Sequence, residues 1–162
     1  MDSNNENKRI GFQSLFKQKS FSQFFNSREE IDTLFSLLSE DEVNRLVEMK
    51  VIFVRCSAPS TKVNLKGINT DDELTLITVD TNYYSKLLPE EFIGVLLHEI
   101  GHVFNPEIQG IQGEFAADNF AKSKGYAKWI ISGLVKGVKN NWMGFEENSC
   151  NLRIENIKKN ND

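Results

Sequence analysis

Both histidines of this 162-residue chain lie in one short stretch, Leu96–Phe104, where a glutamate stands between them. On a helix, residues four apart share a face, so His98 and His102 could each direct an imidazole nitrogen at one metal ion. Glu99 follows His98 directly and would stand beside that ion. Its carboxylate could there take a proton from a metal-bound water without being a ligand. The spacing predicts a zinc centre in preference to two merely structural histidines.

A helix that carries these residues is predicted over Pro89–Phe104. The N-terminal proline needs no partner for its missing N–H, and the carboxylates of Glu90 and Glu91 suit the positive end of the helix dipole. The pattern ends at Asn105-Pro106. Apolar residues cover nearly the whole circumference, so we expect a central, buried helix. Histidines buried there are costly unless they are bonded, and a metal ion would satisfy both.

A second helix is predicted over Glu114–Ala121, with a stop at Gly125. Glu114 and Asp118 share a face of this helix, where paired carboxylates repel each other by roughly a few tenths of a kcal/mol unless a cation offsets the repulsion. We therefore assign Glu114 as the third metal ligand and Asp118 as the acceptor for the far N–H of one histidine. The alternative is a solvated acidic face. Small residues would let this helix approach the first closely: Ala116, Ala117 and Ala121.

Further helices are expected on both sides of this pair. Two capping boxes, Ser27 with Glu30 and Ser39 with Glu42, should each open an amphipathic helix. Tyr126–Asn140 has the same apolar periodicity and is expected to pack in the core.

Two short strands are expected before the histidine helix. Val51–Cys56 is β-branched, as buried strands are, and Leu74–Asp80 mixes apolar residues with threonines. We expect Leu74, Leu76 and Val79 to face inward. Together the elements predict an α+β fold, a small zincin-like domain whose sheet packs on a central active-site helix with flanking helices.

The predicted peptidase domain spans residues 28–147, between two segments of different character. Residues 1–27 are polar and carry phenylalanines at helical spacing: Phe12, Phe16, Phe21, Phe24 and Phe25. Such a stripe could be a helix that packs on its own domain, an inhibitory pro-segment over the cleft, or a membrane-surface helix. The sequence leaves all three open. Residues 148–162 form a polar tail that we expect to be partly disordered.

Composition argues against several classes of function. A net charge of -4 and a pI near 5.3 do not suit a nucleic-acid binder, which needs a basic face. No apolar run is long enough for a membrane span, and Met1–Arg9 lacks the apolar core of a secretory signal, so we expect a cytoplasmic protein. The chain's two cysteines, Cys56 and Cys150, are too few for a disulfide framework. Cysteine catalysis is also not expected, because no histidine is left to act as the catalytic base for either thiol.

The motif His98-Glu-Ile-Gly-His102, followed by Glu114 and Asp118, resembles that of the gluzincin-type zinc metallopeptidases. Its short spacing is similar to that of their minimal single-domain members, the minigluzincin-like proteins, and of small immunity-type peptidases of bacterial mobile elements. The resemblance covers about Leu74–Gly125. It implies one Zn²⁺ ion held by the two histidines and Glu114, with the intervening glutamate as general base.

The resemblance also implies how a substrate would be handled. The strand before the histidine helix would be an edge that pairs with an extended peptide, through Leu74, Leu76 and Thr78. A further tyrosine, histidine or arginine would stabilise the oxyanion, but the chain has no third histidine. Tyr126 is one candidate for this role. The sequence does not choose between it and Tyr83, Tyr84 and Arg153.

The activity expected from these features is hydrolysis of peptide bonds by a zinc-dependent endopeptidase. Few subsites fit on the short C-terminal side, so its specificity should be narrow. The partner would be a peptide or protein substrate, and the N-terminal segment could inhibit in cis. The alternative is a non-catalytic metal-binding module that holds a peptide or a regulatory partner. The presence of Glu99 argues against that module, which has no use for a base. A third alternative is hydrolysis of another kind of bond.

Overall fold

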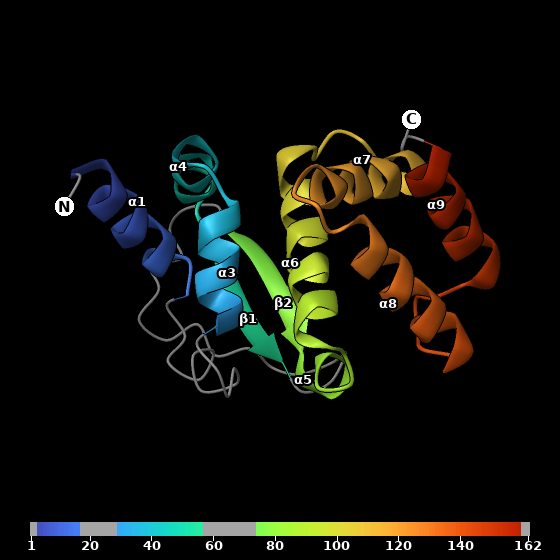
Figure 1. The fold of residues 1–162 in the computed structure, drawn as a ribbon. Helices are drawn as coiled ribbons and strands as arrows, with labels where there is room; N and C mark the ends of the chain where they lie inside the picture. Colours follow the sequence, from blue (N-terminus) through green and yellow to red (C-terminus); the bar gives the residue numbers. More distant parts are fainter. Residues whose placement is uncertain (1–2, 17–28, 57–73, 160–162) are drawn as a thin grey trace. The chain divides into compact units, whose positions relative to one another are not determined.

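The structure is a computed structural model that describes residues 3–16, 29–56 and 74–159. Within these ranges it has eight helices and one two-stranded sheet, which is consistent with the predicted α+β class (Figure 1). The chain divides into two compact units, Met1–Lys86 and Leu87–Asp162, a different division from the three segments expected from the sequence. Among the described helices, none combines the length and apolar character needed to cross a membrane.

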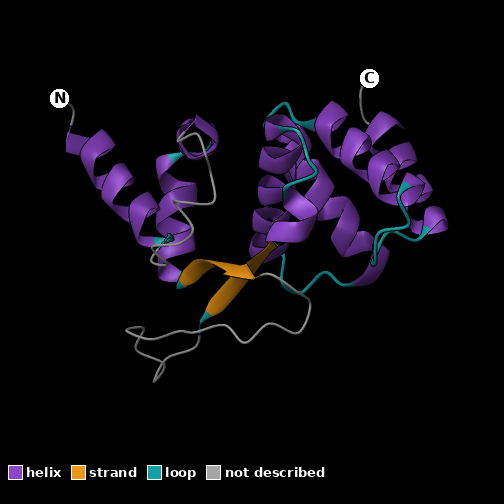
Figure 2. Ribbon diagram, turned by 90° about the horizontal axis from the view of Figure 1, so that it is seen from below, coloured by secondary structure: helices purple, strands orange, loops and turns teal. Residues whose placement is uncertain are grey.

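The first unit combines helices with the sheet. Its described elements are α1 (Ser3–Ser14), α3 (Glu29–Leu37), α4 (Glu40–Glu48), β1 (Val51–Cys56), β2 (Thr75–Asp80) and α5 (Thr81–Tyr84). The two strands lie side by side and pair in parallel, with Val51 opposite Thr75 (Figure 2). The capping box predicted at Ser39 and Glu42 is confirmed at the start of α4, since each side chain accepts a hydrogen bond from the other residue's backbone N–H. The box predicted at Ser27 lies outside the described residues.

The inward face of β2 was predicted correctly for Val79 and wrongly for Leu76. Ile77 and Val79 are buried, whereas Leu76 is 38% exposed. Thr78 is exposed as well, and Leu74 precedes the strand. Successive side chains of a strand alternate between two faces, and β2 carries aliphatic residues on both. Alternation alone therefore did not determine which set faces the core.

Helix α1 packs within the first unit, as the first of the three interpretations of the N-terminal phenylalanines expected. Phe12 and Leu15 are buried, and the ring of Phe16 stacks on that of Phe53 with their centroids 4.8 Å apart. The carbonyl of Leu15 also accepts a hydrogen bond from the N–H of Phe53 at 2.8 Å. The remaining phenylalanines of the stripe lie outside the described residues: Phe21, Phe24 and Phe25.

The second unit consists of four helices: α6 (Pro89–Phe104), α7 (Gly110–Ser123), α8 (Ala127–Lys139) and α9 (Glu147–Lys159). The bounds predicted for α6 are confirmed, with proline first and Asn105 as its C-terminal cap. The buried carboxylate of Glu91 accepts hydrogen bonds from the N–H of Leu88 at 2.9 Å and from the hydroxyl of Ser132 at 2.6 Å, and it is paired with Lys136. It therefore closes the start of α6 and joins it to α8.

Helix α7 runs across the end of α6 that carries the histidines (Figure 1). The two backbones approach closely at Gly101, where a Cβ atom would lie 2.7 Å from Cα of Ala117. Ala117 and Ala121 are fully buried. The close approach predicted from the alanines of α7 is confirmed, and a glycine inside the histidine motif makes it sterically possible.

The expected polar tail is instead a helix. Residues 147–159 form α9, which buries Cys150 and Ile157 and contacts α7. The ammonium group of Lys122 donates a hydrogen bond to the carbonyl of Ile157 at 2.9 Å. A helix that docks along one narrow stripe needs few apolar residues, so polar composition was a poor guide to disorder here.

Candidate metal centre

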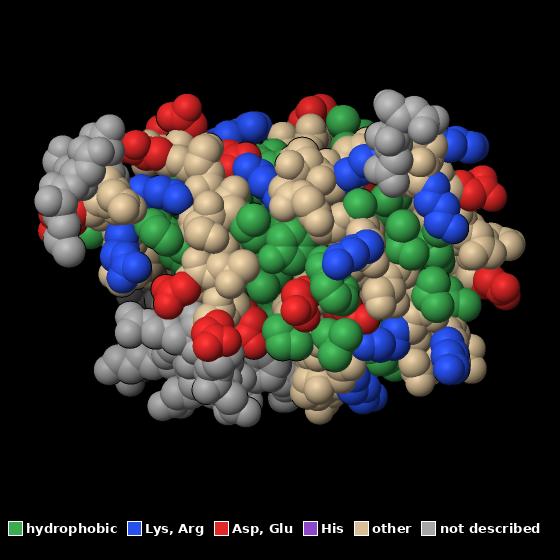
Figure 3. All heavy atoms as spheres, in the orientation of Figure 1, with side chains coloured by type: hydrophobic (Ala, Val, Ile, Leu, Met, Phe, Trp, Pro, Cys, Tyr) green, Lys and Arg blue, Asp and Glu red, His purple; other side chains and the backbone are tan. Residues whose placement is uncertain are grey.

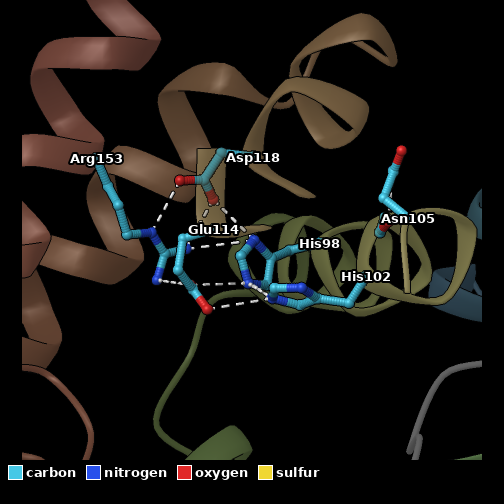
Figure 4. Close-up of polar contacts among 7 residues, drawn as sticks. His98, His102, Asn105, Glu114, Asp118 and Arg153 are labelled. Carbon is cyan, nitrogen blue, oxygen red and sulfur yellow. Dashed lines mark hydrogen bonds and ion pairs between the residues drawn. The ribbon is translucent and has the colours of Figure 1, made fainter. Parts of the chain in front are cut away.

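Both histidines lie on one face of α6, as their spacing predicts (Figure 4). Their Nε2 atoms are 3.1 Å apart. His98 is buried, and the side chain of His102 is about one-third exposed. Neither histidine is visible on the face drawn in Figure 3.

Glu114 projects from the first turns of α7 toward the histidines. Its Oε2 is 3.4 Å from Nε2 of His98, and its Oε1 is 3.3 Å from Nε2 of His102. The structure thus brings together the three residues predicted to be metal ligands. These three side chains form a group that could hold a metal ion.

The spacing of the three donors suits zinc. Tetrahedral zinc bonds of about 2.0–2.1 Å place neighbouring ligand atoms about 3.3 Å apart. Here the two Nε2 atoms are 3.1 Å apart, and each lies close to one oxygen of Glu114: Oε1 is 3.3 Å from His102 and Oε2 is 3.4 Å from His98. Two imidazoles and one carboxylate are also a ligand set typical of catalytic zinc, which leaves one position open. The residues present therefore fit the ion.

Asp118 lies one helical turn beyond Glu114 and is fully buried. Its Oδ1 is 2.8 Å from Nδ1 of His98, which is the contact predicted for it. An Nδ1–H donated to this carboxylate leaves the Nε2 lone pair of a neutral imidazole directed at the other donors.

Arg153 joins the centre from α9. Its Nε and Nη2 donate to the two oxygens of Asp118 at 2.8 and 2.7 Å, and its Nη1 is 2.7 Å from Oε2 of Glu114 (Figure 4). The sequence indicated Arg153 as a candidate oxyanion stabiliser and did not predict these contacts. The stripe Cys150, Arg153 and Ile157, at three- and four-residue spacing, was the signal that α9 is a helix with this side inward.

Electrostatics favour ionised carboxylates in the metal-free centre. Burial by itself lowers the pKa of His98, but its hydrogen bonds to Asp118 and Glu114 raise that pKa to about 8. Hydrogen bonds from the two histidines hold the pKa of Glu114 far below its ordinary value. Burial raises the pKa of Asp118, and hydrogen bonds from Arg153 and His98 more than offset it. A bound cation would therefore meet charged carboxylates and displace a proton from imidazole.

Glu99 follows His98 on α6 and is half-buried. It does not belong to the group of three donors, consistent with a role other than ligation. Its role as general base stays a prediction.

Tyr126 is not brought to the centre. It caps the start of α8, where burial and then the charge of Glu90 raise its pKa. Glu90 lies eight positions before His98 on α6, about 12 Å along the helix axis.

The alternatives Tyr83 and Tyr84 lie in the first unit, with their rings in contact. The substrate-edge residues expected in β2 also lie in the first unit, and that role stays a prediction.

A cleft of about 530 Å³ reaches the centre within the second unit. His102, Glu114 and Arg153 line it, together with Ile108, Ser149 and other residues of the α7 and α9 starts. Cys150 also lines it. Both cysteines of the chain are free, and burial raises the pKa of each thiol, so a reactive thiolate is disfavoured.

Comparisons with protein-family models, with curated proteins and with solved structures gave no match. The centre is accordingly interpreted from its own geometry and chemistry.

Proposed function

We propose that this protein is a zinc-dependent metallopeptidase, an endopeptidase of narrow specificity with a gluzincin-type, zincin-like active site. The observation that carries the proposal is the convergence of His98, His102 and Glu114: the two Nε2 atoms are 3.1 Å apart, and each lies within 3.4 Å of an oxygen of Glu114, which is close to the spacing of ligands around tetrahedral zinc. Asp118 supports it by orienting His98. The position of Glu99, next to a ligand on the same helix, extends the proposal from metal binding to hydrolysis.

His98, His102 and Glu114 would hold the ion in this proposal. Zinc bound in such a site supplies Lewis acidity, which polarises a carbonyl and lowers the pKa of a water toward about 7. Asp118 keeps the proton of His98 on Nδ1, so that Nε2 remains a donor to metal. The cleft beside His102 and Glu114 gives a peptide access to the centre.

Glu99 would act as the general base and then as the general acid. Its carboxylate would accept a proton from the attacking water and deliver it to the leaving amine, so that one group serves both halves of the reaction. A glutamine at this position keeps the size of the side chain and the metal ligands, but it cannot carry the proton.

The test measures zinc content and cleavage of a quenched-peptide library for wild type and Glu99→Gln. Glu107→Gln is the matched control. Glu107 is exposed, and its substitution makes the same chemical change outside the centre. We expect stoichiometric zinc in all three proteins and cleavage by wild type and Glu107→Gln only. Absence of bound zinc from the wild type would refute the whole proposal.

One observation favours a second function, a metal-binding module that holds a peptide or partner without cutting it. His102 and Glu114 line the cleft within the second unit. Among the described residues, Glu99 is not one of those that line this cleft. Stoichiometric zinc without cleavage, together with retention of peptides from the same library, would support this module over the peptidase.

A further inference from the structure

The guanidinium group of Arg153 contacts both carboxylates of the metal centre through different nitrogens. Nε and Nη2 bind the carboxylate of Asp118 as a planar fork, and Nη1 binds Oε2 of Glu114. The side chain of Arg153 is only 14% exposed. A cation this far out of water is tolerated because its charge is paired and its N–H groups are bonded.

The contacts of Arg153 distinguish the two oxygens of Glu114. Oε2 lies 2.7 Å from a terminal nitrogen of the guanidinium and 3.4 Å from Nε2 of His98, whereas Oε1 is 3.3 Å from Nε2 of His102. The ion pair with Arg153 therefore engages Oε2 and leaves Oε1 for a metal ion. The same guanidinium fixes the plane of Asp118, whose Oδ1 faces Nδ1 of His98. With both imidazoles neutral, as metal ligands must be, two carboxylates and one guanidinium leave one net negative charge to attract a cation.

We propose that Arg153 is a positioning residue that sets the donor atoms of the metal centre: Oε1 of Glu114 and Nε2 of His98. It acts through Glu114, through Asp118 and through its own Nη2, which lies 3.3 Å from Nδ1 of His98, rather than by touching the ion or a substrate. The inference rests on the metal binding in the proposed function and is independent of whether peptides are cut.

The inference makes α9 an integral part of the centre. This helix is anchored by buried Cys150 and Ile157 on either side of Arg153, and the hydrogen bond from Lys122 ties its last turn to α7. The helix is thus packed on both sides of Arg153 in the sequence, and the guanidinium group orients the two acidic residues of α7.

Arg153→Lys is the informative variant. It keeps the positive charge, so the repulsion between this side chain and a bound cation is largely retained. It loses the planar fork that bonds two carboxylates at once. A neutral substitution would remove both the charge and the planar fork. Its effect on metal affinity would then combine the loss of positioning with the loss of repulsion between the side chain and the cation.

The experiment titrates Co²⁺ into the metal-free full-length protein and follows the visible absorption bands, with Zn²⁺ competition for affinity. Bands of four-coordinate Co²⁺ are more intense than those of higher coordination numbers. We expect Arg153→Lys to bind about 10–100-fold more weakly, the usual effect of losing a residue that orients ligands. Its bands should also weaken, because Glu114 is freed to offer both oxygens. Lys158→Gln, an exposed change on the same helix, should match wild type.

A second variant separates positioning from folding. Arg153→Ala removes the side chain, and millimolar methylguanidinium, far below denaturing concentrations, should restore the wild-type bands if the missing group is what orients the carboxylates. Circular dichroism confirms that each variant is folded. A folded Arg153→Lys protein with wild-type Co²⁺ affinity and bands would overturn the inference alone. Absence of Co²⁺ and Zn²⁺ binding by wild type would overturn the proposed function and the inference with it.

Discussion

Two buried carboxylates of the second unit are each held by a cation. Asp118 is paired with Arg153 in the metal centre, and Glu91 is paired with Lys136 at the start of α6. Burial of a carboxylate is tolerated where cationic and N–H donors surround it. Glu91 lies seven positions before His98, about 10 Å along α6, so its titration can be followed apart from that of the centre.

The stability of the protein should depend on the ionisation of Glu91. Burial alone raises the pKa of this carboxyl, but hydrogen bonds from Lys136, Ser132 and the N–H of Leu88 bring it below the ordinary value of 4.5. A pKa that is lower in the folded state stabilises the fold above the unfolded pKa, and this contribution disappears as pH falls through the folded pKa. We expect Glu91→Gln to lower the free energy of unfolding by about 1–3 kcal/mol at pH 7. The deficit should shrink as pH falls below 4.5.

Urea unfolding at a series of pH values measures the effect of Glu91→Gln. The control is Glu90→Gln, an exposed carboxylate in the same helical turn, whose substitution should change stability by less than about 0.5 kcal/mol. If the deficit of Glu91→Gln is the same at pH 3 as at pH 7, the ionised carboxylate is not the stabilising group.

Local spacing explains which residues of the centre could be predicted. His98 with His102, and Glu114 with Asp118, are pairs four apart on one helix, and the structure brings all four together. Arg153 is 35 residues from Asp118 in sequence, and no local pattern relates the two. Its contacts follow from the docking of α9 and therefore required the structure.

At the scale of secondary-structure elements, the centre depends on how closely α7 approaches α6. Gly101 lies between the histidines and faces Ala117, three residues beyond Glu114. A side chain at Gly101 would have to push against the backbone of α7, which cannot yield as the end of a flexible side chain can. The glycine thus links helix packing to the distance between histidines and glutamate.

Gly101→Ala should destabilise the protein although alanine is the better helix former. A Cβ atom would lie 2.7 Å from Cα and 2.9 Å from the carbonyl oxygen of Ala117, so the helices must separate. We expect a loss of about 1–3 kcal/mol from overpacking, against a gain of about 1 kcal/mol in helix propensity. Metal affinity should fall as well, because Glu114 moves away from the histidines. Thermal unfolding and Co²⁺ titration measure the two effects.

Gly133→Ala is the matched control for Gly101→Ala. Gly133 lies inside α8, and an added Cβ there would meet nothing within 4 Å. This variant should be unchanged or more stable by up to about 1 kcal/mol, with normal metal affinity. If both variants gain stability equally, the approach of α6 and α7 does not require a glycine.

At the scale of the whole molecule, the chain forms two compact units, and every residue of the metal centre lies in the second. The sequence predicted both strands and the helices α3, α4, α6, α7 and α8, because periodicity is a local property. It did not predict the division at Lys86, the parallel pairing of β1 with β2 or the docking of α9. These depend on contacts between residues far apart in the chain, which no window of sequence contains.

The burial of Phe12 favours one of the three interpretations of the N-terminal phenylalanines, a helix that packs on its own domain. Phe12 is 3% exposed, and its ring lies 5.1 Å from that of Phe16 and 5.3 Å from that of Phe35. Phe12→Ala should therefore lower the free energy of unfolding by about 3–5 kcal/mol. Ile10→Ala, on the same helix but 61% exposed, should change it by less than about 0.5 kcal/mol. Urea unfolding followed by circular dichroism measures both.

Each interpretation of α1 predicts a different set of results for Phe12→Ala. If α1 is a structural helix of the first unit, stability falls, while the folded variant keeps the Co²⁺ bands of wild type because the centre lies in the second unit. An inhibitory segment would instead give unchanged stability and faster peptide cleavage. A membrane-surface helix would give unchanged stability and weaker binding to anionic vesicles. The burial of Phe12 and Leu15 favours the first result, so α1 should be needed for folding rather than removed for activity.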